Sequence, residues 1–174
     1  MEKYFIKKEE ITLRSICQSD EAEFIGWHNN PYNRDKIGSI FPFSSNTFKA
    51  ICKSYNEEYP SNVWFAICEK DELIGIAGLH GIKYIQRNAE VALLIGKEEE
   101  RNKGKGKIVL NLIEKYAFNT LNMHRLYAYI YQDNTASLKF IEKCAWELEG
   151  VLKEASFWNS HFRNVEVWAK LASN

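Results

Sequence analysis

The sequence predicts an α/β (α+β) fold in which a mixed central sheet carries helices on both faces. Short segments rich in β-forming residues alternate along the chain with longer segments whose apolar residues recur at helical spacing. No repeat, linker or low-complexity stretch interrupts the 174 residues, of which 45% are hydrophobic and 26% charged. This length allows one domain with a real core and is short for two, so we expect residues 1–174 to form a single domain.

The first third of the chain predicts one strand followed by two helices. Residues 11–14 form a short strand that starts the domain. Asp20 is expected to cap a helix that stops at residues 29–31, where two asparagines precede a proline. A loop then leads to the serine pair 44–45, which can start a second helix that runs through Tyr55.

Three central strands and a long helix follow. Residues 63–68 and 73–79 are apolar runs joined by the polar turn 69–72, which predicts an antiparallel hairpin. Residues 89–96 supply the third central strand. The helix is expected over about residues 104–121, because its apolar residues recur at three- and four-residue spacing.

The last third of the chain adds a strand over residues 125–131 and a helix that Asn134 opens. Two strands, over residues 146–152 and 165–171, close the chain. The predicted order of elements is therefore β-α-α-β-β-β-α-β-α-β-β, with the long helix placed between the fourth and fifth strands.

The segment between the third central strand and the long helix carries the strongest functional signal. Two glycines, Gly104 and Gly106, let the backbone turn tightly and approach a ligand closely. The first amides of a helix have no intrahelical partner, and the helix dipole adds positive potential there. The sequence therefore predicts a phosphate site in this turn. Its candidate ligand-binding residues are Arg101, Asn102, Lys103, Gly104, Lys105, Gly106 and Lys107.

The spacing of the turn decides among the known phosphate loops. A P-loop would place Ser or Thr where Gly106 stands, and a dinucleotide-binding turn would place a third glycine where Val109 stands. The pattern Arg-x-x-Gly-x-Gly, from Arg101 to Gly106, resembles the coenzyme A loop of the GNAT superfamily of N-acetyltransferases. Taken alone, the motif also suits an ordinary basic turn between a strand and a helix.

Other motifs stand in the order of that family. The predicted element order is that of the GNAT fold, an acyl-CoA N-acyltransferase fold. Residues 27–31, Trp-His-Asn-Asn-Pro, resemble the Trp-x-Asn-x-Pro turn of the branch that contains ribosomal-protein and spermidine acetyltransferases. Residues 116–122 followed by Arg125 resemble the helix-to-strand passage of that branch, and residues 134–137 and 148–150 resemble its C-terminal signature.

The resemblance implies acetyl-CoA as the cofactor and direct transfer of its acetyl group to a primary amine. The implied acceptor is a protein N-terminus, a polyamine, or an amino group on a sugar nucleotide or antibiotic. By the same resemblance, the backbone of Leu94, Ile95 and Gly96 would pair with the pantetheine arm. The amides of residues 102–107 would hold the pyrophosphate, and Asn134 would anchor the arm from the start of the next helix.

The catalytic side chains depart from the usual family pattern. Many GNAT enzymes carry a Tyr proton donor where this chain has Ile141, and a glycine where it has Ala145. In the ribosomal-protein branch a Ser three residues after the helix-opening Asn is proposed for the donor role, and Ser137 occupies that position; an ordinary first-turn serine is the alternative. Glu90 is the candidate base for the incoming ammonium, and a solvent-facing carboxylate is the alternative.

The candidate substrate-binding residues come from one strand and one turn. Tyr129 and Tyr131 lie on the same face of their strand, where they can line an acceptor pocket or simply pack. Trp27 and His28 belong to a turn that would border this pocket. The remaining histidines have no motif partner and are expected to be structural or on the surface: His80, His124 and His161.

The composition of the chain limits its expected binding partners and its expected cellular location. The formal net charge is zero, which disfavours direct nucleic-acid binding. No apolar run approaches the roughly 20 residues of a membrane span, and the N-terminus lacks the apolar core of a signal peptide. Four scattered cysteines predict no metal site and a reducing cytoplasm. The last hairpin, with Phe157, Trp158 and Phe162, can supply an apolar contact for a homodimer.

Two other functions stay open at this point. The absence of the Tyr at position 141 also fits a domain that binds acyl-CoA without turnover, as a sensor or interaction module. A nucleotide-phosphate binder unrelated to coenzyme A would instead show affinity for ATP or GTP that survives competition by coenzyme A.

Overall fold

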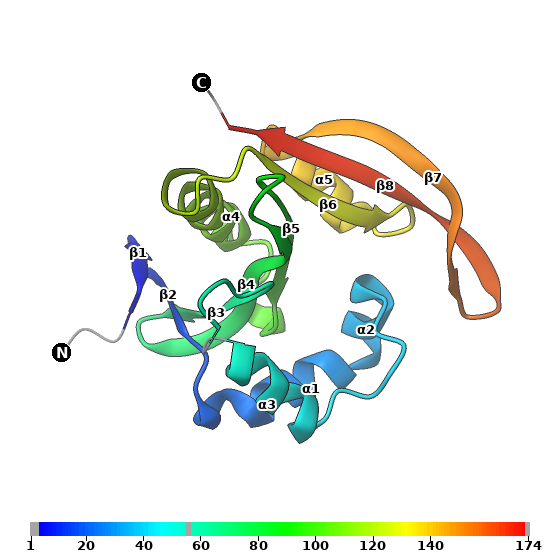
Figure 1. The fold of residues 1–174 in the computed structure, drawn as a ribbon. Coiled ribbons are helices and arrows are strands. Elements are labelled where there is room, and N and C mark those ends of the chain that lie inside the picture. The colour runs from blue at the N-terminus through cyan, green and yellow to red at the C-terminus, as the bar shows by residue number, and fades with distance from the viewer. Residues whose placement is uncertain (1–3, 55–56, 173–174) are drawn as a thin grey trace.

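The computed structural model describes residues 4–54 and 57–172 of the chain. Eight strands form one sheet in the order β1-β2-β3-β4-β5-β6-β8-β7 (Figure 1). All neighbouring strands pair antiparallel except β5 and β6, which are parallel, so the sheet is mixed as predicted. The strands are β1 (Ile6–Lys8), β2 (Ile11–Ser15), β3 (Val63–Glu69), β4 (Glu72–Lys83), β5 (Asn88–Ile95), β6 (Arg125–Tyr131), β7 (Glu147–Trp158) and β8 (His161–Leu171).

Helices cover both faces of this sheet, which confirms the predicted layering (Figure 1). On β3, Phe65 and Ile67 point into the core beneath α4 and α5, whereas Trp64 and Ala66 point into a smaller cluster with α1 and α3. The helices are α1 (Glu21–Asn29), α2 (Pro31–Ile37), α3 (Ser45–Ser54), α4 (Lys105–Lys115) and α5 (Thr135–Lys143), and a π-helical turn (Tyr116–Thr120) continues α4. Tyr55, expected in the second predicted helix, lies outside the described residues.

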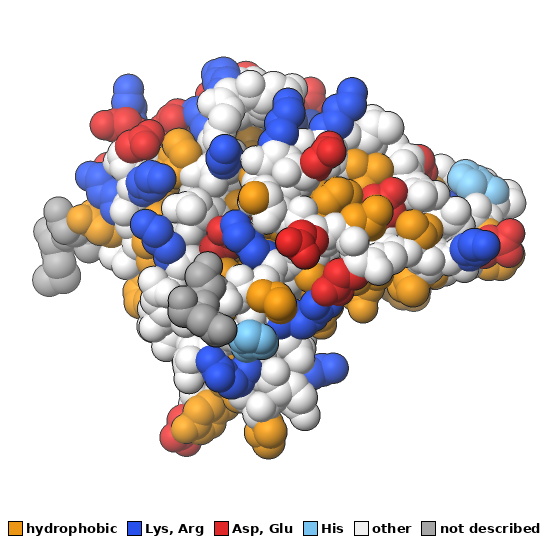
Figure 2. Space-filling model, turned by 90° about the horizontal axis from the view of Figure 1, so that it is seen from above, with side chains coloured by type: hydrophobic (Ala, Val, Ile, Leu, Met, Phe, Trp, Pro, Cys, Tyr) orange, Lys and Arg blue, Asp and Glu red, His pale blue; other side chains and the backbone are white. Residues whose placement is uncertain are grey.

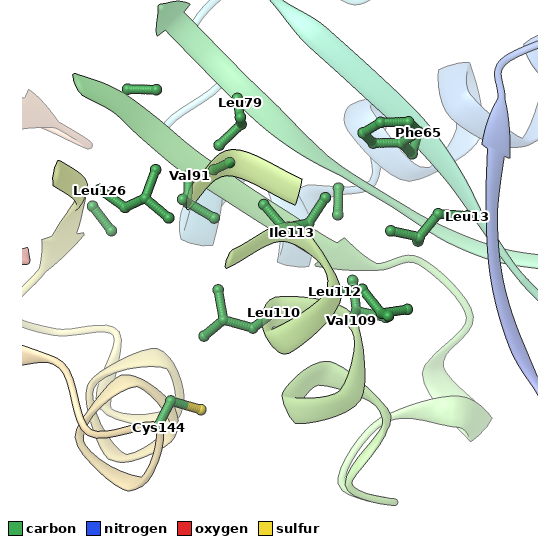
Figure 3. Close-up of a cluster of buried hydrophobic side chains, with 14 of the residues drawn as sticks. Leu13, Phe65, Leu79, Val91, Val109, Leu110, Leu112, Ile113, Leu126 and Cys144 are labelled. Atoms are coloured by element: carbon green, nitrogen blue, oxygen red, sulfur yellow. The ribbon is translucent and has the colours of Figure 1, made fainter. Parts of the chain in front are cut away.

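Helix α4 is held by the larger of the two cores (Figure 3). Its buried residues Val109, Leu112 and Ile113 pack among side chains from the sheet, including Leu79 and Leu126. Burial of one such aliphatic side chain contributes about 2 kcal/mol. This packing fixes the position of the helix, and with it the position of the glycine turn at its N-terminus.

Strands β5 and β6 pair over a short length only. Their register joins Asn88 to Arg125, Ala89 to Leu126 and Glu90 to Tyr127. Strand β5 continues to Ile95, and β6 remains paired with β8 on its other edge over its whole length. The two strands therefore diverge beyond Glu90, and the edge of β5 from residue 91 to 95 has no pairing with β6.

Strand β1 and helix α2 were not predicted from the sequence. Strand β1 precedes β2 and pairs with it at the edge of the sheet. Helix α2 begins directly after α1, because Asn30 accepts hydrogen bonds from the backbone N–H groups of Tyr32 and Asn33 and Pro31 occupies the first helical position. Proline at that position starts a helix as readily as it ends one. Pro31 was interpreted only as a stop.

The predicted cap at Asp20 is wrong. Its side chain makes no capping hydrogen bond to α1. Instead the carboxylate accepts two hydrogen bonds of 2.7 Å from the guanidinium of Arg14 and one of 2.9 Å from the N–H of Cys17. Asp20 is buried, and a fork of two charge-assisted hydrogen bonds is stronger than a single cap.

The last hairpin is longer than predicted. Its turn residues Asn159 and Ser160 both have positive φ, 48° and 66°, the combination that a two-residue hairpin turn requires. Phe157 and Phe162 are exposed as expected, but Trp158 packs beside the guanidinium groups of Arg34 and Arg163. On the face shown in Figure 2, hydrophobic side chains continue along the arm formed by this hairpin, and basic side chains are interspersed with acidic ones.

None of the helices in residues 4–54 and 57–172 is long and apolar enough to cross a membrane.

Candidate active site

The turn before α4 has the geometry of an anion site. Asn102 and Gly104 adopt left-handed backbone angles, with φ of 59° and 80°, and Gly104 caps the helix. The N–H of Lys107 donates to the carbonyl oxygen of Gly104 at 3.1 Å, so the amides before it lie at the open end of the helix. Gly106 faces α5, where a Cβ would lie 3.2 Å from the ring of Phe140. The turn can therefore present backbone N–H groups to a phosphate.

Two of the four basic side chains predicted for this site turn into the protein instead. Arg101 donates from Nε to the carbonyl of Ile95 at 2.9 Å and from Nη2 to the carbonyl of Gly96 at 3.0 Å. Lys105 is buried between the carboxylates of Glu69 and Glu100. Burial alone would lower the pKa of Lys105, but hydrogen bonds to these two carboxylates raise it above its ordinary value.

Lys103 and Lys107 are the basic side chains of the turn that remain at the surface. Lys103 is more than half exposed and contacts Glu100 at 3.2 Å. Lys107 is exposed and lines a cavity of about 230 Å³ beside the first turn of α4, together with Gly104 and Asn111. A phosphate in the turn would therefore be held by backbone amides, with charge from these two lysines.

The backbone N–H groups at the end of β5 point in two directions, either toward β4 or away from it. The N–H of Gly96 donates to the carbonyl of Ile74 at 2.9 Å. Backbone groups alternate in direction along an antiparallel pair, so the N–H of Ile95 points away from β4, toward the diverging β6. Of the predicted backbone partners, Ile95 thus faces the gap, whereas Leu94 and Gly96 pair toward β4.

Trp27 packs against this same point of the strand. A Cβ on Gly96 would lie 2.1 Å from the Trp27 ring, so the glycine is needed for the close approach of α1. Asn33 of α2 links the two helices, because its amide donates to the carbonyl of Trp27 at 2.9 Å and its Oδ1 accepts from Arg101 at 2.9 Å. Trp27 was predicted to line the acceptor pocket, and its ring is largely occupied by this packing.

The start of α5 has the predicted geometry. Asn134 is buried and caps the helix, its Oδ1 accepting from the N–H of Ser137 at 3.2 Å. Ser137 itself is partly exposed in the first turn. Ile141 is buried in the core and offers no hydroxyl. Cys144 is also buried, which raises the pKa of its thiol, with Glu114 adding to the effect.

A polar group stands at the point where β5 and β6 separate. Glu90 is the last β5 residue opposite β6, and His80 is its direct partner across the β4–β5 pair, with Nε2 of the imidazole 3.3 Å from Oε1. His80 stacks on Trp64 with ring centroids 5.7 Å apart. Burial, with the negative charge of Glu90, raises the pKa of Tyr127.

His80 was expected to have no motif partner and to be structural or on the surface, and the structure places it 3.3 Å from Glu90. Folding the hairpin of β4 and β5 about its turn would have placed the two residues opposite each other. The two strands were predicted over residues 73–79 and 89–96, which leaves His80 just beyond the first, and their register was not predicted.

Three tyrosines extend from this point along β6. Leu126, Ala128 and Ile130 belong to the core beneath α4, so the odd-numbered side chains face the side of α1 to α3. The rings of Tyr127 and Tyr129 lie 5.6 Å apart, and Tyr129 is half exposed. Tyr131 lies 3.5 Å beneath the guanidinium of Arg163.

His28 has structural partners. Its Nδ1 lies 2.8 Å from the carbonyl oxygen of Phe24, and its ring stacks on Phe43 with centroids 4.2 Å apart. Burial lowers the pKa of His28, so the ring is held neutral between α1 and the following loop.

The arrangement fits a nucleotide carrier of the coenzyme A type. An eleven-residue helix begins at the glycine turn and can take the diphosphate. The unpaired edge of β5 can take an extended amide chain as an added strand, and α5 borders the same turn through the contact of Phe140 with Gly106.

Comparisons with known proteins agree with this geometry. A model of the acetyltransferase (GNAT) domain matches residues 10–147. The spermidine N(1)-acetyltransferase of Vibrio cholerae is 29% identical over 160 residues, which cover 90% of each chain.

Two solved structures of spermidine N-acetyltransferase from Vibrio cholerae resemble the whole fold. The complex with CoA and spermine has a TM-score of 0.84 at 25% identity and covers 93% of this chain and 95% of that chain. The dodecameric structure in an intermediate state has a TM-score of 0.78 at 25% identity, with 93% and 94% covered. The chain therefore belongs to the GNAT family of acetyltransferases, and it transfers an acetyl group from acetyl-CoA to an amine.

Proposed function

We propose that the acceptor is a small polyamine that enters from the side of α1 to α3 and lies along the tyrosines of β6. The observation that carries this proposal is the row formed by Tyr127, Tyr129 and Tyr131, which starts beside Glu90. The guanidinium of Arg163 already covers the ring of Tyr131, so Tyr127 and Tyr129 are the members of the row that would contact the amine. Aromatic faces attract ammonium groups, and carboxylates pair with them.

The far end of the row also carries carboxylates. Asp133 lies two residues beyond Tyr131, and its carboxylate is half exposed. Arg163 contacts it at 3.4 Å and lies 3.9 Å from one carboxylate oxygen of Asp35, and the other oxygen of Asp35 lies 3.5 Å from the ammonium of Lys36. An extended polycation can therefore find carboxylates at both ends of the aromatic row. Relatives that act on spermidine support the same class of acceptor.

The chain's own residues would hold acetyl-CoA as follows. The amides of residues 102–107 would take the diphosphate, the backbone N–H of Ile95 would pair with the pantetheine arm, and Asn134 would border the arm at the start of α5. Bound there, acetyl-CoA supplies the activated acetyl group. Ser137 would donate a hydrogen bond to the leaving sulfur, and Glu90 is placed for the proton transfer that frees the amine.

The proposal also covers the domain organisation, the assembly and the cellular location of the protein. The single eight-stranded sheet supports one functional unit over residues 1–174. The exposed Phe157 and Phe162, together with the dodecameric relative, support assembly with further copies of the chain. Four free cysteines support a reducing compartment, the cytoplasm.

A panel of amines tests the acceptor class. Release of the coenzyme A thiol would be measured with spermidine, a peptide with a free N-terminal serine, and glucosamine. We expect kcat/KM for spermidine to exceed that for the other two by about tenfold or more, a difference of about 1.4 kcal/mol. A preference for the peptide or the sugar would overturn the polyamine assignment.

Two variants of Tyr129 test whether the tyrosine row binds the amine. Tyr129→Ala should raise KM for spermidine several-fold, because the aromatic face is lost, whereas Tyr129→Phe keeps the face and should stay near the unsubstituted protein. Binding of coenzyme A by calorimetry without thiol release from any of the three amines would favour the non-catalytic sensor instead.

A further inference from the structure

We propose that Lys105 is a positioning residue for acetyl-CoA. Its ammonium, bound to Glu69 and Glu100, holds the turn before α4 in the shape that presents backbone N–H groups to the diphosphate, and it does not itself contact the phosphate. This inference rests on the placement of acetyl-CoA proposed above and adds the contact that keeps the site formed. A lysine in such a turn is ordinarily interpreted as a ligand of the phosphate.

The ammonium of Lys105 joins three segments of the chain. Lys105 is the first residue of α4, Glu69 is the last residue of β3, and Glu100 ends the short 3₁₀ turn that follows β5. Nζ of Lys105 donates a hydrogen bond to Oε2 of each glutamate. The contact with Glu100 ties the end of the turn to its beginning, and the contact with Glu69 fixes the turn to the sheet. These three residues form the clamp of the turn.

The backbone N–H groups of the turn do not stabilise its shape. Within residues 4–54 and 57–172, no hydrogen bond is donated by the backbone N–H groups of residues 102–106. Asn102 and Gly104 both have left-handed backbone angles, with φ of 59° and 80°. Amides that are free for a phosphate cannot also bind carbonyl groups of the turn, so its shape must come from side-chain contacts.

The side chain of Lys105 is committed to the clamp. Only 10% of it is exposed. Burial would lower the pKa of Lys105, but hydrogen bonds to the two carboxylates raise it above its ordinary value, so the side chain stays an ammonium at neutral pH. Turning Nζ toward a phosphate would break both contacts. A cation in the first turn also opposes the helix dipole, so α4 itself does not explain a lysine at this position.

The two ends of the turn are anchored separately. At its start, Arg101 binds two carbonyl oxygens at the end of β5. At its end, Lys105 binds two carboxylates. Lys103 and Lys107 remain at the surface. The four basic side chains therefore divide into two that shape the turn and two that can add charge to a bound phosphate.

Glu100 gives the sharpest test, because two interpretations predict opposite signs. If charge alone governs the turn, Glu100→Ala removes a carboxylate near the diphosphate and should tighten the binding of coenzyme A. If the clamp governs, the same substitution releases Lys105 and should weaken binding. We expect the Kd for coenzyme A, measured by calorimetry, to rise about tenfold, since the released turn must be ordered on binding. A lower Kd would overturn the proposal.

Lys105→Met tests the clamp from its other side. KM for acetyl-CoA should rise about tenfold with kcat little changed, measured with whichever amine of the panel is acetylated best. The kcat/KM for acetyl-pantetheine, which lacks the diphosphate, should stay unchanged, whereas general structural damage would lower it too. Lys105→Arg should retain most of the affinity, because a guanidinium can also donate to both carboxylates. Equal losses with both acetyl donors, or an unchanged KM for acetyl-CoA, would contradict the clamp.

Lys97→Met is the matched control. Lys97 pairs with Glu72, which stands opposite Glu69 in the hairpin of β3 and β4, so the substitution and the change in charge are the same but the partner lies outside the clamp. The Kd for coenzyme A should equal that of the unsubstituted protein. A similar rise in both lysine variants would show that any lost cation weakens binding, against the clamp. If Lys105→Met does not fold by circular dichroism, the sign of the Glu100→Ala effect decides.

Lys107→Gln separates this inference from the placement of the cofactor. Lys107 is exposed beside the turn and outside the clamp, so its loss should raise the Kd for coenzyme A through charge alone. If Lys107→Gln weakens binding and Lys105→Met does not, the placement stands and the clamp is wrong. If neither variant weakens binding in an active enzyme, the diphosphate lies elsewhere, and the placement falls together with the clamp.

Discussion

Ala145 stands at a position that favours glycine. It follows Cys144, the last residue that caps α5, and has a φ of 57°. An L-residue in this left-handed conformation costs about 1 kcal/mol, which glycine avoids. The side chain of Ala145 is exposed, so its removal leaves no cavity.

Ala145→Gly should therefore stabilise the protein by about 0.5–1 kcal/mol. The free energy of unfolding would be measured by urea titration. Ala136→Gly, at an exposed position of the first turns of α5, is a control that should destabilise by a similar amount, because it adds backbone freedom without relieving strain. Destabilisation by both substitutions would contradict the strain argument.

A second prediction for a single residue concerns Ser137. If its hydroxyl stabilises the departing sulfur, Ser137→Ala should lower kcat about tenfold or more and leave the Kd for acetyl-CoA nearly unchanged. The backbone bond from its N–H to Asn134 would remain, so the helix start should survive. Turnover equal to that of the unsubstituted protein would remove Ser137 from the mechanism.

Single residues were predictable where their role is local. The cap at Asn134 and the glycine turn at Gly104 depend on neighbours within a few positions, and both were anticipated. The partner of Lys105 was not anticipated, because Glu69 lies 36 positions away along the chain and becomes a neighbour only in the folded protein. The partner of Asp20, Arg14, is only six positions away, but the carboxylate was interpreted as a helix cap instead.

Helices and strands follow the same rule as single residues, because those set by a local pattern were predicted. The apolar runs of the central strands and the helical spacing of α4 are local patterns, and they predicted those elements and the layers on both faces. Helix α2 was missed because one residue, Pro31, both follows α1 and begins α2. The divergence of β5 from β6 depends on pairing between segments more than 30 residues apart, which no local pattern reports.

The contact of α1 with β5 yields a prediction for two elements. Gly96→Ala should destabilise the protein by about 1–3 kcal/mol, because the added methyl meets the Trp27 ring. Trp27→Leu alone should also destabilise, but the double variant should lose less than the sum of the two, because the smaller side chain leaves space for the methyl. Urea unfolding of all four proteins measures this coupling, and strict additivity would show that the two residues do not meet.

At the scale of the whole molecule, the two faces of the sheet are unequal. The core beneath α4 and α5 includes most of the buried side chains, whereas α1 and α3 share a smaller cluster with Phe24, Phe48 and Ala66. His28 lies on the edge of this smaller layer, stacked on Phe43. The layer that borders the acceptor side is thus the one more easily opened.

The stability of the molecule should respond to pH through His28. Burial lowers its pKa in the folded state below the ordinary value of 6.5, so the unfolded chain binds a proton first as the pH falls. Unfolding free energy should therefore decrease below about pH 6.5, by up to 1.4 kcal/mol per pH unit from this group. Urea titrations at about pH 7.5 and about pH 5.5 should show a smaller loss for His28→Gln than for the unsubstituted protein. Equal losses would exclude His28 as the source.

The guanidinium of Arg101 connects the end of β5 beside the proposed nucleotide site to the helices that would flank the amine. Arg101 binds the carbonyls at the end of β5 and the amide oxygen of Asn33, which in turn holds α1 through the carbonyl of Trp27. A nucleotide that immobilises the turn therefore also restrains the two helices that would flank the amine. The substrates should then add in compulsory order, with acetyl-CoA leading, and free coenzyme A should inhibit competitively against acetyl-CoA but not against the amine.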